Sequence, residues 1–132
     1  MSNGVRLQIL PALVRVIFCK FYRLRNGFTA TGNNTSALVN PGVYLFNLNS
    51  VPTIPAGVTV SGINLVTGNL STGIIINSYG LITVSNLNAS NNGAGGTGSG
   101  AVLNTNNLPS TKAYGVSLTG INVFSGNADD GL

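Results

Sequence analysis

The chain has 132 residues, of which 43% are apolar, so it is long enough for one domain with a buried core. Charge is scarce, because six lysines and arginines stand against two aspartates, and glutamate and histidine are absent. The usual general bases are therefore missing. The single cysteine, Cys19, excludes an internal disulfide and a multi-cysteine metal cluster.

The N-terminal segment, residues 1–26, carries five of the six cations. Its apolar residues fall at helical spacing between Leu10 and Leu24, which predicts an amphipathic helix that caps the repeat region, although the β-branched residues also permit a strand. A targeting segment and a helix on an anionic membrane surface are the alternatives. The apolar run is interrupted by Arg15 and followed by basic residues, the wrong order for a cleavable signal. We expect any membrane contact to be made through residues 1–25.

Two chemical signals lie in the same segment. Cys19 is close to Lys20 and Arg23, an environment that activates thiols, but without a histidine we interpret it as a packed apolar residue. Residues 20–25 mix basic and aromatic side chains, as segments that bind nucleic acid do. The run is short and residues 26–132 add no basic patch, so we expect no nucleic-acid partner.

Residues 27–132 contain a repeat that predicts a stacked fold. The sequence GVTVSGINLVTGN at Gly57–Asn69 returns 58 residues later as GVSLTGINVFSGN at Gly115–Asn127. Such a repeat is typical of architectures in which one unit cannot bury its apolar face alone. An antiparallel β-sandwich would explain short strands equally well, but it would not explain why the same residues recur in phase.

Each repeat unit opens with a glycine that is followed by alternating apolar residues. These glycines are Gly42, Gly73, Gly100 and Gly131. The units are 31, 27 and 31 residues long. Alternation with period two and β-branched residues predict short strands, and glycine and asparagine at the breaks suit turns. The sequence therefore predicts an all-β fold, a β-helix (solenoid) of about three to four coils.

Stacked coils place equivalent residues in columns about 4.8 Å apart. We predict two interior columns from the strand-like runs of the repeat. The first contains Val58, Ile82 and Val116, and the second contains Val60, Val84 and Leu118.

Asparagines also recur once in each unit, in two sets. The sets are Asn47, Asn77 and Asn104, and Asn64, Asn88 and Asn122. Side-chain amides that stack in this way form hydrogen-bonded ladders along the stack. We therefore predict asparagine ladders from these sets, with a ligand-binding row on the surface as the alternative.

Differences in unit length are expected in loops. Residues 49–56 and 106–113 contain prolines, which cannot donate a ladder hydrogen bond, and residues 91–100 contain five glycines. These three segments are predicted to lie outside the strands.

The pattern at Gly80–Asn92, GLITVSNLNASNN, resembles the right-handed parallel β-helix repeat of the pectin-lyase-like class, as do Gly57–Gly73 and Gly115–Gly131. The resemblance covers residues 27–132 and implies a single-stranded right-handed β-helix. Proteins of this kind include polysaccharide lyases and hydrolases, phage tailspikes and repetitive bacterial surface proteins. The Asn/Gly-rich, charge-poor composition is most similar to the last group, which implies an extracellular or cell-surface location.

Carboxylates for catalysis are nearly absent. Glycoside hydrolysis needs two carboxylates on opposite sides of a bond, but Asp129 and Asp130 are adjacent and are interpreted as solvated turn residues. The lyases that the repeat resembles use a basic residue, often with calcium held by acids, and Lys112 is the only cation after residue 26. We therefore predict no enzymatic activity, no catalytic residue, no metal site and no cofactor.

The expected function is that of a non-enzymatic structural or adhesive module from a secreted or cell-surface repetitive protein, with glycans or other β-solenoid chains as partners. One alternative is a fragment of a carbohydrate-active enzyme whose catalytic residues lie outside this chain. Another is an incomplete gene product without its own function. Gly131 and Leu132 begin a new coil, so we expect bare strand edges and end-to-end self-association there.

Overall fold

The computed structural model describes residues 8–9, 14–17, 22–33, 40–47, 57–105 and 114–132, and every regular element within them is a β-strand. The strands are β1 (Gln8–Ile9), β2 (Val14–Ile17), β3 (Tyr22–Leu24), β4 (Phe28–Thr31), β5 (Val43–Asn47), β6 (Val58–Val60), β7 (Asn64–Thr67), β8 (Ile74–Ser78), β9 (Ile82–Ser85), β10 (Leu87–Ser90), β11 (Ala101–Thr105) and β12 (Val116–Thr119).

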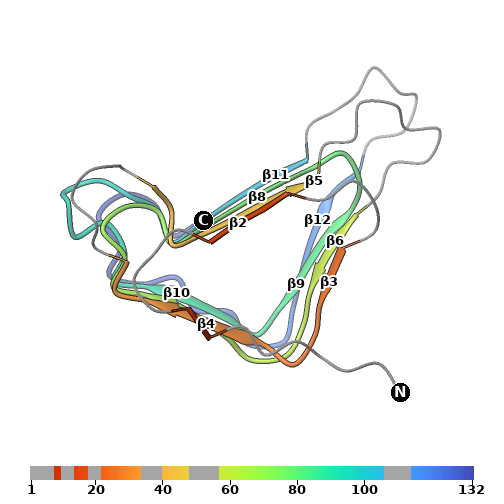
Figure 1. Ribbon diagram of the computed structural model, residues 1–132, viewed down its shortest axis with the longest axis horizontal. Coiled ribbons are helices and arrows are strands. Elements are labelled where there is room, and N and C mark those ends of the chain that lie inside the picture. The colour runs from red at the N-terminus through yellow and green to blue at the C-terminus, as the bar shows by residue number, and fades with distance from the viewer. Residues whose placement is uncertain (1–7, 10–13, 18–21, 34–39, 48–56, 106–113) are drawn as a thin grey trace.

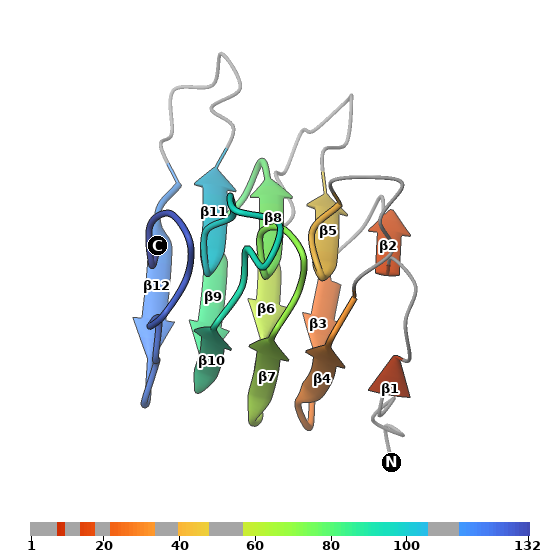
Figure 2. The ribbon, with the colours of Figure 1, turned by 90° about the vertical axis from the view of Figure 1, so that its left-hand side faces the viewer.

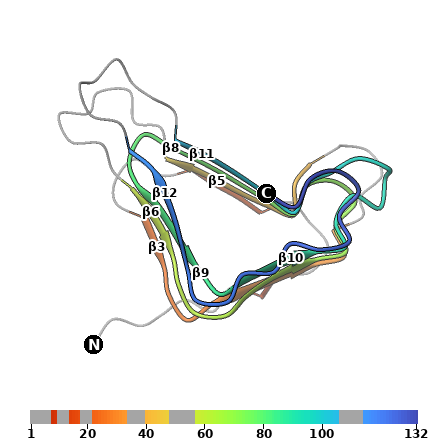
Figure 3. The same ribbon diagram turned by 180° about the vertical axis from the view of Figure 1, so that it is seen from behind.

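The strands form three four-stranded parallel sheets, ordered β1-β4-β7-β10, β2-β5-β8-β11 and β3-β6-β9-β12. The sheets make the three sides of a triangular coil, seen from opposite sides in Figures 1 and 3. Successive coils lie next to one another, with β12 at one end of the stack and β1 and β2 at the other (Figure 2). The prediction of a right-handed parallel β-helix is confirmed.

The two predicted interior columns are confirmed by strand register. In the first column, Val58 pairs with Ile82 and Ile82 pairs with Val116. In the second column, Val84 pairs with Val60 on one side and with Leu118 on the other. In β4 to β10 alternate residues point inwards and are buried, because a β-strand has a side-chain period of two. The apolar core is Phe28, Ala30, Val43, Leu45, Val58, Val60, Val66, Ile74, Ile76, Ile82, Val84, Leu87, Ala89 and Ala101.

The predicted coil starts are also in register. Gly73 N donates to Ser99 O and Gly100 N donates to Asp130 O, so each of these glycines stacks on the start of the next coil. A Cβ on Gly73 would lie 2.5 Å from Gly100 O and 2.6 Å from Asn92 Nδ2. Glycine recurs at this position because any side chain would collide with the neighbouring coil.

The helix predicted between Leu10 and Leu24 is wrong for the described part of that segment. Val14–Ile17 is β2, which pairs with β5, and Tyr22–Leu24 is β3, which pairs with β6. The β-branched residues favour a strand, and pairing with an existing sheet satisfies backbone groups that a short isolated helix would leave at its ends. Whether residues 1–26 also act as a cap or targeting segment stays a prediction.

The loops differ in how far the structure describes them. Residues 91–100 connect β10 to β11 through a turn in which Gly93, Gly96 and Gly98 have positive φ, as the glycine-rich composition indicates. Residues 49–56 and 106–113 lie in the gaps of the described ranges, so their predicted loops are not tested. No helix in the described residues is long and apolar enough to cross a membrane.

Candidate functional site

In each predicted asparagine row, one asparagine is out of register with the other two by one residue. Asn64 pairs with Leu87, and Asn88 instead forms a bridge with Val123. The reason is a corner that is one residue shorter between Val84 and Leu87 than the corresponding corner before Asn64. A shift of one residue moves a side chain to the opposite face of a strand.

The other predicted row has the same fault. Asn77 pairs with Asn104, as expected, but Asn47 pairs with Ser78. Asn47 stands five residues after its coil-start glycine, whereas Asn77 stands four residues after its own. Neither set therefore forms a continuous column.

A different set of asparagines forms the ladder. It contains Asn33, Asn69, Asn92 and Asn127. Asn33 Nδ2 donates to Asn69 Oδ1 at 2.8 Å, Asn69 Nδ2 donates to Asn92 Oδ1 at 2.8 Å, and Asn92 Nδ2 donates to Asn127 Oδ1 at 3.1 Å. The donors all point towards the C-terminal end of the stack, so the ladder has a direction.

Each inner rung of this ladder also bonds to the backbone. Asn92 Nδ2 donates to Val66 O at 3.1 Å, and the Oδ1 of Asn92 accepts a further bond from Asn69 N at 3.2 Å. Asn69 and Asn92 are buried and saturated in this way, which is the condition for a stabilising polar group inside a protein. We assign the ladder to structure, because its inner amides are not accessible to a ligand.

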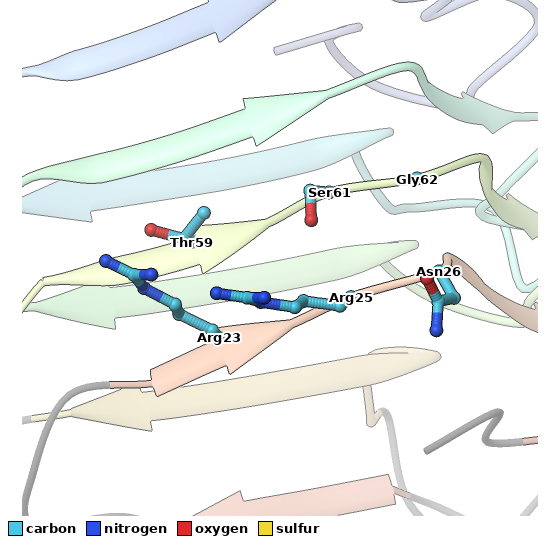
Figure 4. A pocket seen from close by; sticks show the side chains of 6 residues that line it. All are labelled: Arg23, Arg25, Asn26, Thr59, Ser61 and Gly62. Atoms are coloured by element: carbon cyan, nitrogen blue, oxygen red, sulfur yellow. The ribbon is translucent and has the colours of Figure 1, made fainter. Parts of the chain in front are cut away.

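The candidate binding site lies on the outer face of the β3-β6-β9-β12 sheet. A shallow hollow of about 460 Å³ is lined by Arg23, Arg25, Asn26, Thr59, Ser61 and Gly62. Arg23 pairs with Thr59 in the adjacent strand. Arg25 is two residues further along the chain, so its side chain lies on the same face as that of Arg23, and both side chains are exposed to solvent. Figure 4 shows the two guanidinium groups extended in the same direction along the face.

The positive charge of this hollow is not neutralised within the chain. Arg23 and Arg25 are exposed, and the only two acidic residues of the sequence are Asp129 and Asp130. These aspartates lie beyond β12, at the opposite end of the stack from β3, and Asp129 Oδ2 accepts a hydrogen bond from Gly98 N at 2.7 Å. Two adjacent unpaired guanidinium groups attract anions, and their planar donors suit carboxylate and sulfate groups.

Rows of hydroxyl groups extend from the arginines along the same face. Thr59, Thr83 and Ser117 are paired in register, and Ser85 pairs with Thr119 in a second row. Neighbouring members of a row are about 4.8 Å apart, which is the spacing of paired strands. The face therefore offers regularly spaced hydrogen-bonding groups on a surface whose backbone is held by ladders on both sides of β6 and β9.

Sequence reasoning did not find this site. It selected no binding residue, and it considered Arg23 only as a neighbour of Cys19 and, together with Arg25, as part of a basic and aromatic run. Asp129 and Asp130 are exposed beyond β12, whereas Cys19, Lys20 and Lys112 lie outside the described residues. Among the described residues, no three acidic, histidine or cysteine side chains gather as metal ligands. The available signal was a pair of arginines two residues apart, of which Arg23 lies within the Tyr-Arg-Leu strand β3 and Arg25 directly follows it.

Comparison of the chain with models of protein families, with curated proteins and with solved structures gives no match. The assignment of the fold as a β-helix therefore depends on the parallel register of the strands in the structure. The relation to pectin-lyase-like proteins and to repetitive bacterial surface proteins stays a prediction.

Proposed function

We propose that the protein is a non-enzymatic structural and adhesive β-helix module that binds an acidic glycan on the outer face of the β3-β6-β9-β12 sheet. The observation that carries this proposal is the pair of unneutralised arginines, Arg23 and Arg25, at the end of two rows of hydroxyl groups. A secreted or cell-surface location, where such glycans occur, belongs to the same proposal.

The chemistry of the face matches that of a charged sugar chain. Guanidinium groups bind carboxylate or sulfate groups through paired N–H donors, while Thr59, Thr83 and Ser117 offer hydroxyl groups that both donate and accept. An extended glycan that lies across the coils would place its acidic groups near Arg23 and Arg25 and its hydroxyl groups along the rows.

The rigidity of the sheet supports binding by this face. Ser61 Oγ donates to Leu24 O at 3.1 Å and Ser85 Oγ donates to Val60 O at 3.4 Å, so these hydroxyls are positioned before a ligand arrives. A surface that is already ordered loses little conformational entropy on binding. Each exposed charge contributes little alone, so a single module binds weakly, and adhesion requires several contacts along one glycan.

A titration with an oligogalacturonate, followed by backbone amide chemical shifts, tests this function. We expect shifts at Thr59, Ser61 and Thr83 with the acidic probe and much smaller shifts with a neutral cellulose oligosaccharide. The double variant Arg23→Gln/Arg25→Gln should weaken binding at least tenfold.

The matched control removes two other positive charges, through Arg15→Gln and Lys112→Gln, and should bind the probe within about threefold of the unmodified chain. Equal weakening in both double variants would show that only overall charge matters and would contradict the site. Shifts that cluster on another sheet would also contradict it.

A further inference from the structure

The C-terminal face of the β-helix exposes residues that continue the interior columns. Val58 and Ile82 are completely buried, but Val116, the next member of their column, is 42% exposed. Leu118 and Phe124 are only partly buried against the core. No segment within the described residues covers β12 on the side away from β9. This face therefore has the interior chemistry of the fold, but solvent reaches it.

A hollow of about 330 Å³ opens on the same face. Its lining includes Ala101, Leu103, Val116 and Leu132, which come from β11, β12 and the residues beyond them. The first three belong to columns whose earlier members form the core, so the hollow is the open end of the helix interior. An apolar side chain from a further coil is the group that would fill it in the manner of the coils below.

The asparagine ladder is also open at this end. Asn69 and Asn92 each use Nδ2 twice, once to a backbone carbonyl and once to the next asparagine. Asn127 Nδ2 donates to Ala89 O at 3.1 Å, and the described residues hold no acceptor for its second N–H. The face thus presents a directed donor, together with the free edge of β12.

Charge decides which surface complements this face. Asp129 and Asp130 lie at the C-terminal end, whereas Arg15 lies in β2, Arg23 lies in β3 and Arg25 directly follows β3, and β2 and β3 are the outermost strands of their sheets at the other end. Contact between a C-terminal end and an N-terminal end therefore brings opposite charges together. Contact between two C-terminal ends would place the aspartates of both copies close to one another.

Backbone geometry favours the same arrangement. A second copy placed with its β1–β3 coil on β10–β12 continues three parallel ladders with the same strand direction. Two C-terminal ends facing one another would instead force antiparallel pairing on edges that are shaped by parallel neighbours.

We propose that copies of this chain stack end to end, with the C-terminal face of one copy on the N-terminal coil of the next. Because the two surfaces differ, each added copy leaves a new C-terminal face exposed, and the assembly is an open fibre. This inference does not depend on glycan binding. A fibre would, however, align the hydroxyl rows of many copies along one face and so supply the several contacts that adhesion needs.

Sedimentation velocity over a range of protein concentrations tests the stacking. The unmodified chain should form a ladder of oligomers whose mean size grows with concentration and falls as salt is raised, because the end charges are screened. A chain that stays monomeric at millimolar concentration would overturn the proposal.

Three substitutions locate the contact. Val116→Lys places a charge on the C-terminal face and should lower the association constant at least tenfold, whereas Ile63→Lys, at a site 82% exposed on a corner, should leave it unchanged. Association that survives Val116→Lys would overturn the proposal. Asp130→Lys separates the two arrangements, because it weakens stacking of unlike ends and strengthens contact between two C-terminal ends. Circular dichroism melting of each variant establishes that it folds.

Discussion

Replacing Asn92 by alanine should remove the central rung of the asparagine ladder. The Asn92 side chain takes part in four hydrogen bonds within 3.2 Å: it accepts from Asn69 N and Asn69 Nδ2, and it donates to Val66 O and Asn127 Oδ1. Alanine at position 92 removes one hydrogen bond from each of these four partner atoms. Three of the atoms belong to the buried residues Asn69 and Val66.

The expected loss follows from that count. A hydrogen bond inside a protein contributes about 1 kcal/mol, so four of them give a destabilisation of about 4 kcal/mol. A domain of this size has a free energy of unfolding of about 5–15 kcal/mol, so Asn92→Ala should come close to abolishing folding or lower the urea midpoint substantially.

The assay is equilibrium unfolding in urea, followed by circular dichroism at a protein concentration that is low enough to suppress association. Asn104→Ala is the matched control, because Asn104 is an exposed asparagine on β11, and it should change stability by less than about 0.5 kcal/mol. If Asn92→Ala is as mild as Asn104→Ala, the ladder does not stabilise the fold and the reasoning is refuted.

Three further predictions concern the core, the coil starts and the site. Ile76→Ala should cost about 2–5 kcal/mol in urea unfolding because Ile76 is completely buried, whereas Ile63→Ala should be nearly neutral. Gly73→Ala should destabilise by at least about 1–3 kcal/mol, since its Cβ would meet Gly100 O, while Gly115→Ala has open space and should not; equal melting temperatures would contradict the stacking of coil starts. Arg23→Gln/Arg25→Gln should weaken oligogalacturonate binding at least tenfold in the amide-shift titration without changing the urea midpoint by more than a tenth.

The stacked fold was predictable because several signals agree in residues 57–118. Alternation places Val58 and Val60 on one face, the 58-residue repeat places Val116 and Leu118 above them, and glycine marks each coil start. The N-terminal strands were not predictable in the same way. A short apolar run that contains Val14 and Ile17 satisfies helical and strand periodicity alike, and only pairing with β5 decides between them.

The asparagine ladder shows how a correct physical idea can fail through register. Sequence spacing aligned Asn64 with Asn88, but the corner before Leu87 is one residue shorter and reverses the faces. The true rungs Asn69 and Asn127 are the last residues of the two copies of the repeat, so a pattern for them was present. In the structure Asn69 lies against Gly42 and Asn127 lies against Gly100, and spacing along the chain does not reveal these contacts.

The candidate binding site was missed for a different reason, the prediction of a helix where the structure has β3. In a helix, Arg23 and Arg25 would point to different sides, whereas in a strand and its extension they share one face. The prediction of a helix therefore did not place the two arginines on one face. Only the pairing of β3 with β6 places Arg23 beside Thr59.

Methyl cross-relaxation between strands tests the parallel stacking of coils most directly. With methyl-labelled valine and leucine, we predict that Val84 shows nuclear Overhauser contacts to both Val60 and Leu118, because each lies one coil away at about 4.8 Å between backbones, and that Val60 and Leu118 show none to one another. Contacts from Val84 to only one of them, or a pattern in which neighbouring strands run in opposite directions, would contradict the β-helix.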